Sequence, residues 1–210
     1  MRVEIWSDVI CPWCYLGKAR FDKALATFDH RDDVEVRFRS FELDPSRAKD
    51  DIVSIERMLT ERYGANASEM EDRVADVARA EGLGYRTDRE VGNTFDAHRL
   101  LHLARPHGLE SDLVAALFTA NFAEAQPIFT GDTLLDIAVR TGLDKDEVRR
   151  VLDDPDAYAQ DVRQEQREAA ALGATGVPFF VIDRRYGISG GQPVDVFAQT
   201  LDRAWADTHA

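Results

Sequence analysis

The sequence predicts an α/β protein in which one sheet domain is interrupted by a large all-helical insertion. Three observations lead to this fold class. Residues 1–45 alternate between strand, helix and strand patterns, residues 46–173 contain no convincing strand, and residues 174–210 return to strand patterns before a last helix. Because two sheet-forming segments flank one helical block, we expect a discontinuous domain of residues 1–45 and 174–210, with residues 46–173 inserted into it.

The first segment has the pattern of a β-α-β unit. Val3, Ile5 and Trp6 indicate a short strand, and the alternation of apolar and charged residues from Val34 to Ser40 indicates a half-buried second strand. Between them, apolar residues recur at helical spacing: Leu16, Ala19, Phe21, Ala24, Leu25 and Phe28. A crossover of helix length predicts that the two strands are parallel and that their connection is right-handed.

The middle segment has the pattern of successive amphipathic helices. Residues 87–90 and 144–147 have the spacing of helix-capping boxes, so we expect a helix to begin at each. Glycines separate the apolar helix faces at Gly108, Gly131 and Gly142.

The last segment predicts two strands and a helix. The run Phe179–Ile182 is apolar throughout, which is typical of a strand buried on both faces. A polar turn at residues 183–185 leads into a second short strand at residues 186–190. Pro193 then opens a final helix with apolar residues at Val196, Phe197, Leu201 and Trp205.

Composition excludes several classes of function. The chain of 210 residues carries a net charge of −13, which argues against nucleic acid and anionic membranes as partners. No apolar stretch approaches the ~20 residues that a membrane span needs. Met1 leads directly into the first predicted strand, without the basic, apolar and small-residue regions of a signal peptide, so we expect a cytoplasmic protein.

The two cysteines of the chain, Cys11 and Cys14, form a Cys-Pro-Trp-Cys motif just after the first predicted strand. Pro12 suits the first position of a helix, which makes Cys11 the N-cap. The free amides of Trp13 and Cys14 then point at the Cys11 sulfur and favour its thiolate, the nucleophilic form. Cys14 lies one turn further along, close enough to form a disulfide, so the motif predicts a redox-active dithiol.

Two other interpretations of the cysteines stay open on the residues alone. A structural zinc needs four ligands, and His98 and His102, spaced i and i+4, are the best completion of the set. Inert buried thiols are the other alternative. Pro12 favours a capped helix over a zinc knuckle, so we predict no metal.

A second motif, Thr175-Gly176-Val177-Pro178-Phe179, precedes the first strand of the last segment. Together with the N-terminal dithiol, it resembles the thioredoxin superfamily, in which a cis-proline loop packs against the dithiol. The resemblance implies a cis Val177–Pro178 bond. It also implies that the backbone of Val177 is available to pair with an extended substrate strand or with glutathione.

The resemblance narrows to the DsbA-like oxidoreductases, and within them to the FrnE subgroup, whose name comes from a polyketide biosynthesis cluster. It rests on the runs Ser7–Gly17, Asn93–Thr94 with Ala97–Leu100, and Thr175–Ile182 with Ser189–Gln192. It implies a thioredoxin-like fold with a large all-helical insertion and thiol–disulfide oxidoreductase activity. Cys11 would attack and Cys14 would resolve, on protein or small-molecule thiols and disulfides, without a cofactor beyond the dithiol. Glutathione is a candidate co-substrate.

The same branch includes glutathione-dependent isomerases of hydroxychromene carboxylate and kappa-class glutathione transferases, which act on aromatic small molecules. Those proteins typically carry serine at the position of Cys11, so the intact pair favours dithiol chemistry. This chain also differs from the periplasmic DsbA enzymes, because no histidine lies between its cysteines. That difference argues against a strongly oxidising role.

Further polar and aromatic residues are candidates for the site. Asp8 could assist proton transfer, although an acid at a strand end is more often simply solvated. Glu42 has apolar neighbours that could raise its pKa for the same role, although a plain surface turn explains it at least as well. Asn93 and His98 are expected to line a groove facing the dithiol, the alternatives being a helix cap and an exposed histidine. Trp13 is a candidate contact surface for a partner chain.

Overall fold

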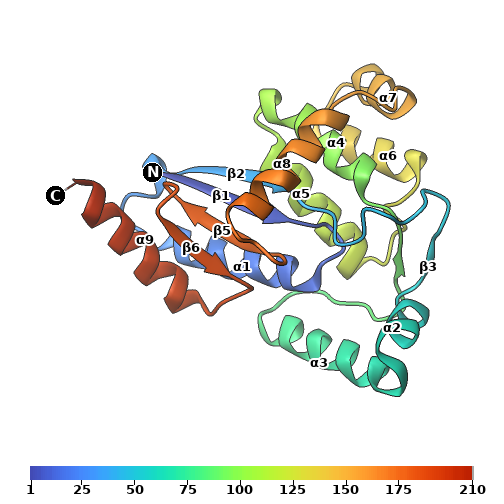
Figure 1. Ribbon diagram of the computed structural model, residues 1–210, viewed down its shortest axis with the longest axis horizontal. Helices are drawn as coiled ribbons and strands as arrows, with labels where there is room; N and C mark the ends of the chain where they lie inside the picture. Colours follow the sequence, from blue (N-terminus) through green and yellow to red (C-terminus); the bar gives the residue numbers. More distant parts are fainter. Residues whose placement is uncertain (210) are drawn as a thin grey trace. The chain divides into compact units, whose positions relative to one another are not determined.

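The computed structural model describes residues 1–209, and the chain divides into two compact units (Figure 1). The sheet unit consists of Met1–Leu43 and Arg163–Ala210, and the helical unit consists of Asp44–Val162. The sequence placed the boundaries after residues 45 and 173. The second boundary differs because it falls inside a helix that begins in the helical unit and continues onto the sheet.

The sheet unit is built on four strands in the order β2-β1-β5-β6. Strands β1 (Arg2–Ser7) and β2 (Glu35–Ser40) are parallel, as predicted for a β-α-β unit. Strand β5 (Phe179–Ile182) pairs antiparallel with β1, and β6 (Tyr186–Ser189) pairs antiparallel with β5. The pairing of β1 with β5 joins the two ends of the chain in one sheet.

One face of the sheet is covered by α1 (Pro12–Ala26) and α9 (Val194–His209). Phe21 of α1 lies with its ring centroid 5.6 Å from that of Phe180 and 5.8 Å from that of Phe197 of α9. All three rings are buried. Since Phe180 pairs with Ile5 of β1, this aromatic cluster fixes the dithiol helix to the centre of the sheet.

The other face carries α8 (Ala159–Ala171). Trp6, Ala169 and Val181 form a buried apolar cluster on this face. The indole Nε1 of Trp6 donates a 2.8 Å hydrogen bond to the carbonyl oxygen of Glu165. The helix is therefore bound to the sheet through both apolar and polar contacts.

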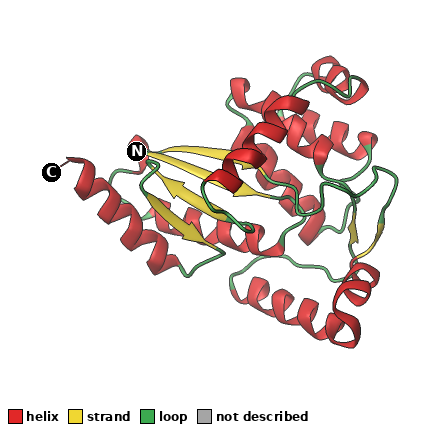
Figure 2. Ribbon diagram, viewed as in Figure 1, coloured by secondary structure: helices red, strands yellow, loops and turns green. Residues whose placement is uncertain are grey.

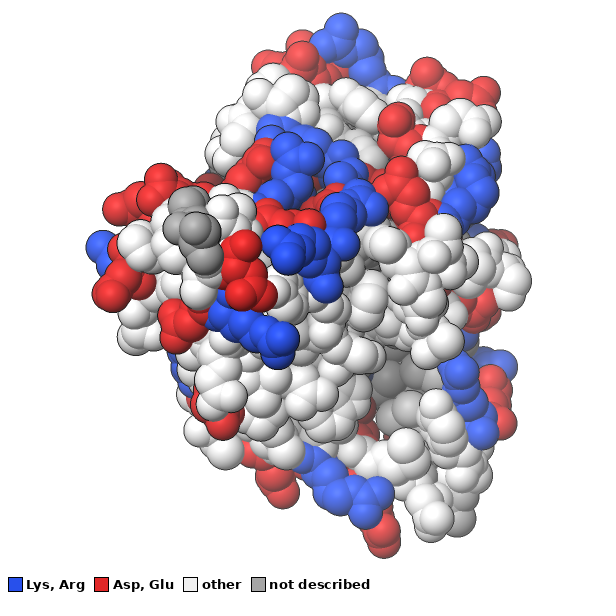
Figure 3. Space-filling view, turned by 60° about the vertical axis from the view of Figure 1, so that its left-hand side comes forward, with Lys and Arg blue, Asp and Glu red and all other residues white. Residues whose placement is uncertain are grey.

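An ionic network around two buried carboxylates reinforces the attachment of α8. Arg39 of β2 donates to Glu165 at 2.7 Å and to Glu4 of β1 at 2.9 Å, while Glu165 also accepts from the amide of Ser40 at 2.7 Å. Arg184, in the turn between β5 and β6, donates to Glu4 as well. This network explains why the insertion ends before Arg163 and not at residue 173. On the face shown in Figure 3, basic side chains likewise adjoin acidic ones.

The helical unit contains mostly helices (Figure 2). Their bounds are α2 Ile55–Tyr63, α3 Ala67–Ala80, α4 Phe95–Ala104, α5 Glu110–Phe118, α6 Gly131–Thr141 and α7 Lys145–Asp153, with a π-helical turn at Thr119–Ala123. Short 3₁₀ turns lie at Gly64–Asn66 and Arg105–His107 here, and at Arg31–Asp33 in the sheet unit. The buried guanidinium of Arg99 donates to carbonyl oxygens at the end of α7 and beyond it, which ties α4 to that region.

Two sequence predictions for this unit were wrong. The segment is not free of strands, because β3 (Val53–Ser54) and β4 (Glu90–Val91) form a two-stranded antiparallel ladder. Strands of two residues are too short to show a period of two. No helix begins at residues 87–90 either, since Glu90 lies in β4. By contrast, Asp144 caps α7 as predicted, accepting from the amides of Asp146 and Glu147.

No helix within residues 1–209 has the length and apolar character needed to cross a membrane.

Candidate active site

Cys11 stands at the N-cap of α1, where the chain leaves β1 and turns into the helix. Its amide donates to the carbonyl of Asp8 at 3.1 Å, and its carbonyl accepts from the amide of Cys14 at 3.0 Å. Pro12 occupies the first turn of the helix. The Cys11 side chain makes no capping hydrogen bond of standard geometry, but the amides of Cys14 and Trp13 lie near enough to act on its sulfur.

The two sulfurs ionise differently. The hydrogen bond from the Cys14 thiol is the largest effect on Cys11 and lowers the pKa of Cys11 below its ordinary value. Burial opposes this effect, the amides of Cys14 and Trp13 support it, and the negative charge of Asp8 opposes it. Cys11 is therefore the sulfur that deprotonates first.

Cys14 is held as a thiol. Burial, the hydrogen bond to Cys11 and the charge of Cys11 raise the pKa of Cys14 well above its ordinary value. The hydroxyl of Ser7 and the amide of Asp8 act in the opposite direction. Both cysteines are buried, and the pair differs in ionisation, with one sulfur that deprotonates first and one that stays a thiol, as thiol–disulfide exchange requires. Sequence reasoning did not single out Ser7, because only the fold brings its hydroxyl to Cys14.

The proline loop lies against Cys11. The Val177–Pro178 peptide bond is cis, and the Cys11 thiol donates a 3.5 Å hydrogen bond to the carbonyl oxygen of Val177. The carbonyl of Pro178 accepts from the amide of Gly190 at 2.8 Å. Pro178 is buried and Val177 is half-buried. The Val177 carbonyl thus accepts a hydrogen bond from the Cys11 thiol in this structure, and its pairing with a substrate strand stays a prediction.

Two glycines allow α1, the proline loop and the loop before α9 to approach closely. A Cβ atom at Gly17 would lie 3.0 Å from Cγ of Pro178, and one at Gly191 would lie 3.0 Å from the carbonyl oxygen of Trp13. Arg20 of α1 donates to the carbonyl of Gly191 at 2.7 Å. From the sequence, both glycines were named only as parts of the family motifs. A close approach between segments that are distant in the chain leaves no pattern in the sequence.

The two acidic candidates of the sheet unit are both buried. Asp8 is fully inaccessible, and its Oδ2 accepts from the amide of Leu43 at 2.7 Å. Glu42 is 6% exposed. The interpretations of Asp8 as a solvated strand end and of Glu42 as part of a surface turn were therefore wrong. Trp13, by contrast, is 43% exposed, as a contact surface would need to be.

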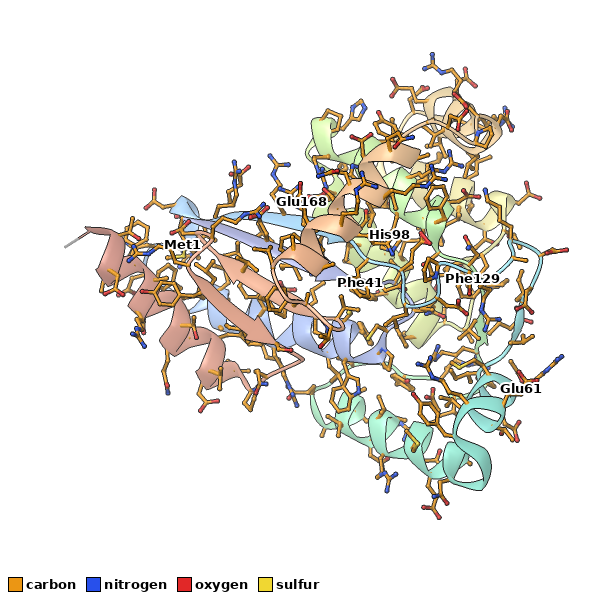
Figure 4. All side chains as sticks on the ribbon, viewed as in Figure 1. Met1, Phe41, Glu61, His98, Phe129 and Glu168 are labelled. Carbon is orange, nitrogen blue, oxygen red and sulfur yellow. The ribbon has the colours of Figure 1, made fainter. Side chains whose placement is uncertain are left out.

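The remaining candidates belong to the helical unit. The side chain of Asn93 donates to the carbonyl of Arg47 at 2.8 Å and accepts from the amide of Phe95 at 3.0 Å, so it organises the start of α4. His98 lies on α4 and is 1% exposed, which excludes the exposed-histidine interpretation (Figure 4). A groove formed by these residues and facing the dithiol stays a prediction.

Zinc ligation finds no support in the part of the chain that the structure describes. Within residues 1–209, no group of three or more His, Cys, Asp and Glu side chains is placed to hold a metal ion. His102, the other candidate ligand, stacks with its ring centroid 6.1 Å from that of Tyr158.

Comparisons with known proteins agree with this architecture. The family model of the DSBA-like thioredoxin domain matches residues 2–202. A crystal structure of a probable DsbA oxidoreductase from Streptomyces coelicolor is 58% identical, covers 98% of this chain and 90% of that one, and superposes with a TM-score of 0.94.

Two further structures share the fold at low identity. The cytosolic disulfide reductase DsbM of Pseudomonas aeruginosa with GSH has 18% identity and a TM-score of 0.65, covering 98% of this chain and 100% of that one. A 2-hydroxychromene-2-carboxylate isomerase has 13% identity and a TM-score of 0.70, covering 100% of each chain. The thioredoxin-like fold class is thereby confirmed, and the chain belongs to the DSBA-like thioredoxin domain family.

Proposed function

We propose that this protein is a thiol–disulfide oxidoreductase in which Cys11 attacks and Cys14 resolves. The observation that carries the proposal is the placement of Cys11 at the N-cap of α1, in contact with the carbonyl of Val177 in the cis-proline loop and with the thiol of Cys14. This arrangement lowers the pKa of Cys11, while burial raises the pKa of Cys14. In a dithiol with this asymmetry, the first sulfur gives up its proton at a lower pH than the second, which stays protonated until it is needed.

The exchange proceeds in two steps, attack by Cys11 and then attack by Cys14. The Cys11 thiolate attacks one sulfur of a substrate disulfide, a mixed disulfide forms, and the other substrate sulfur leaves as a thiolate. Cys14 then attacks the sulfur of Cys11, the Cys11–Cys14 disulfide forms, and the second substrate sulfur leaves with the proton from Cys14. Two electrons pass from the dithiol to the substrate. The reverse sequence oxidises a substrate dithiol.

Other groups around the dithiol have proposed roles in this reaction. Val177 and Pro178 would bind the substrate backbone beside Cys11, and the exposed ring of Trp13 would contact it. Asp8 would transfer protons, which its burial and its effect on Cys11 support, and Glu42 is a second buried acid for that role. Asn93 and His98 complete the proposed substrate-binding residues.

The proposed setting follows from the family resemblance and from the charge of the chain. We place the protein in the FrnE subgroup and in the cytoplasm, with a link to polyketide biosynthesis. Its partners would be protein or small-molecule thiols and disulfides, with glutathione as co-substrate and with no metal or organic cofactor. Nucleic acid and membranes are not expected partners, since the net charge is −13.

Reduction of insulin by dithiothreitol tests the proposal. Wild-type protein should accelerate the precipitation of insulin chains. Cys11→Ser should abolish the acceleration, while Cys14→Ser should accumulate mixed disulfides because the resolving thiol is gone. Undiminished activity in Cys11→Ser would refute the mechanism.

The rival function is a glutathione-dependent isomerase or transferase of the hydroxychromene carboxylate isomerase or kappa type. The similarity in fold to a 2-hydroxychromene-2-carboxylate isomerase, over the full length of both chains, is the observation that favours this second candidate. In that reaction the thiol of glutathione does the chemistry, and Cys11 and Cys14 would be incidental. The hydrogen bond between the two thiols and its effect on Cys11 favour the oxidoreductase.

A further inference from the structure

Ser7 is the last residue of β1, and its side chain is buried beside the dithiol. The chain turns sharply after it, because the amide of Cys11 donates back to the carbonyl of Asp8 at 3.1 Å. This turn brings the end of the strand under the first turn of α1. The Ser7 hydroxyl and the Asp8 amide both reach the sulfur of Cys14 as a result.

We propose that Ser7 is a positioning residue for the resolving step, because its hydroxyl donates a hydrogen bond to the sulfur of Cys14 as that sulfur becomes a thiolate. The inference rests on the proposed oxidoreductase function and deepens it. It assigns to Ser7 a role in the second exchange step only. The first step uses the sulfur of Cys11, whose neighbours are Cys14, Trp13, Asp8 and the Val177 carbonyl.

The hydrogen bond from Ser7 has its effect in the mixed disulfide, when Cys14 must become a thiolate. Once Cys11 is bonded to a substrate sulfur, it carries no negative charge, so the repulsion that Cys11 exerts on a Cys14 thiolate disappears. Burial, which is the largest obstacle to ionisation of Cys14, remains. A buried anion needs hydrogen-bond donors to replace water, and Ser7 and the Asp8 amide are two donors at this sulfur.

The groups that act on Cys14 come from the end of β1, the loop after it and the N-cap of α1. Cys11, the N-cap of α1, disfavours a second negative charge when it is a thiolate. Asp8 contributes an amide to Cys14 and a carboxylate whose charge acts on Cys11. The Ser7 hydroxyl carries no charge. Its removal therefore changes the solvation of Cys14 without changing the net charge of the site.

Reaction with one equivalent of 5,5′-dithiobis(2-nitrobenzoate) separates the two steps in the full-length protein. Attack by Cys11 forms a mixed disulfide and releases the first thionitrobenzoate. Attack by Cys14 on Cys11 then forms the intramolecular disulfide and releases the second, and the Cys14 proton passes to solvent. Both releases are followed by absorbance in a stopped-flow instrument.

The decisive comparison is Ser7→Thr against Ser7→Val, because these side chains have the same shape and differ in the hydroxyl. The second release should be about fivefold to fifteenfold slower in Ser7→Val. This range combines the strength of a hydrogen bond to a charged group with the partial dependence of thiolate nucleophilicity on pKa. The first release should agree within about twofold between the two variants, as expected if the hydrogen bond acts on Cys14 alone.

The pH profile of the second release provides a readout that a purely structural role would leave unchanged. Its midpoint should lie about one pH unit or more higher in Ser7→Val than in Ser7→Thr. Ser7→Ala repeats the test if the branched side chains disturb folding. Ser40→Ala is the control, since Ser40 pairs with Ser7 across β1 and β2 and should leave both releases as in the wild type.

The outcomes separate this inference from the function on which it rests. Suppose that the wild type releases two equivalents, but that the second release has the same rate and pH profile in Ser7→Val as in Ser7→Thr. This outcome would overturn the role of Ser7 and leave the proposed function in place. A wild-type protein that releases only one equivalent would overturn the proposed function and this inference together. Slowing of both phases to the same extent would also refute the assignment, because it would indicate general disturbance of the site.

Discussion

The thiol of Cys11 donates a 3.5 Å hydrogen bond to the carbonyl oxygen of Val177, a residue 166 positions further along the chain. One partner comes from the N-cap of α1 and the other from the loop before β5. The nucleophile and the backbone that would bind a substrate are therefore in contact already. A substrate strand that pairs with the Val177 carbonyl would arrive with its disulfide beside the Cys11 sulfur.

The ionisation of Cys11 should respond in opposite directions to two substitutions. Cys14→Ala removes the thiol donor that most strongly lowers the pKa of Cys11, so that pKa should rise. Asp8→Asn removes a negative charge that disfavours the thiolate, so the pKa of Cys11 should fall. The rate of alkylation by iodoacetamide against pH measures both shifts.

The expected pH dependence of that reaction has a definite sign. Because the pKa of Cys11 is below the ordinary thiol value, alkylation should be fast at a pH where a free cysteine is still mostly protonated. The rate should fall as the pH drops through the lowered pKa. A midpoint at the value of a free thiol would contradict the proposed N-cap chemistry.

Gly17→Ala should destabilise the protein through overpacking. The added methyl group would lie 3.0 Å from Cγ of Pro178 and 3.3 Å from Cα of Gly191, so the helix and both loops would have to move apart. We expect a loss of about 1–3 kcal/mol in the free energy of unfolding, measured by urea denaturation. Gly131→Ala is the matched control. Its Cβ would meet nothing within 4 Å, and a stability equal to or slightly above that of the wild type is expected.

Glu165→Ala should be strongly destabilising, because it removes one carboxylate partner of Arg39 and the carboxylate that accepts from the amide of Ser40. A loss of about 3–5 kcal/mol in the free energy of unfolding is typical of breaking one partner out of a buried pair. Glu61→Ala removes the exposed partner of Arg57 and should cost less than about 1 kcal/mol. Equal losses in the two variants would show that the network does not anchor α8.

Trapping with Cys14→Ser should distinguish the two enzyme candidates. An oxidoreductase that acts on proteins should accumulate covalent adducts through Cys11, visible on non-reducing gels and removed by dithiothreitol. The double variant Cys11→Ser/Cys14→Ser provides the background. Trp13→Ala, made together with Cys14→Ser, should reduce the yield of protein adducts because it removes an exposed contact surface beside Cys11. Capture of glutathione alone would favour the isomerase or transferase.

The sequence predicted the features that depend on local spacing. The dithiol, the N-cap at Cys11 and the parallel pair β1 and β2 follow from patterns within about 40 residues, where periodicity and helix geometry decide the outcome. The position of α8 was missed because its own sequence is polar and amphipathic. Its attachment depends on Trp6 and Arg39, which lie more than a hundred residues away in the chain.

The same limit applies to the environment of the sulfurs. Asp8 is a polar residue at the end of a strand, and nothing in its neighbours along the chain indicates that it is fully buried. The contact between Gly17 and Pro178 also joins distant segments. Sequence patterns therefore placed the two cysteines at the start of a helix, whereas the ionisation of their sulfurs depends on contacts that only the folded chain brings together.

The pairing of β1 with β5 has a consequence for synthesis on the ribosome. The cysteines leave the exit tunnel early, but their partner Val177 follows 166 residues later, which at about 5–20 residues per second is a delay of roughly ten to thirty seconds. During this interval the central strand lacks its β5 neighbour and the Cys11 sulfur lacks its carbonyl contact. A nascent chain thus contains both thiols before it contains the strand and the carbonyl that contact β1 and Cys11 in the folded protein.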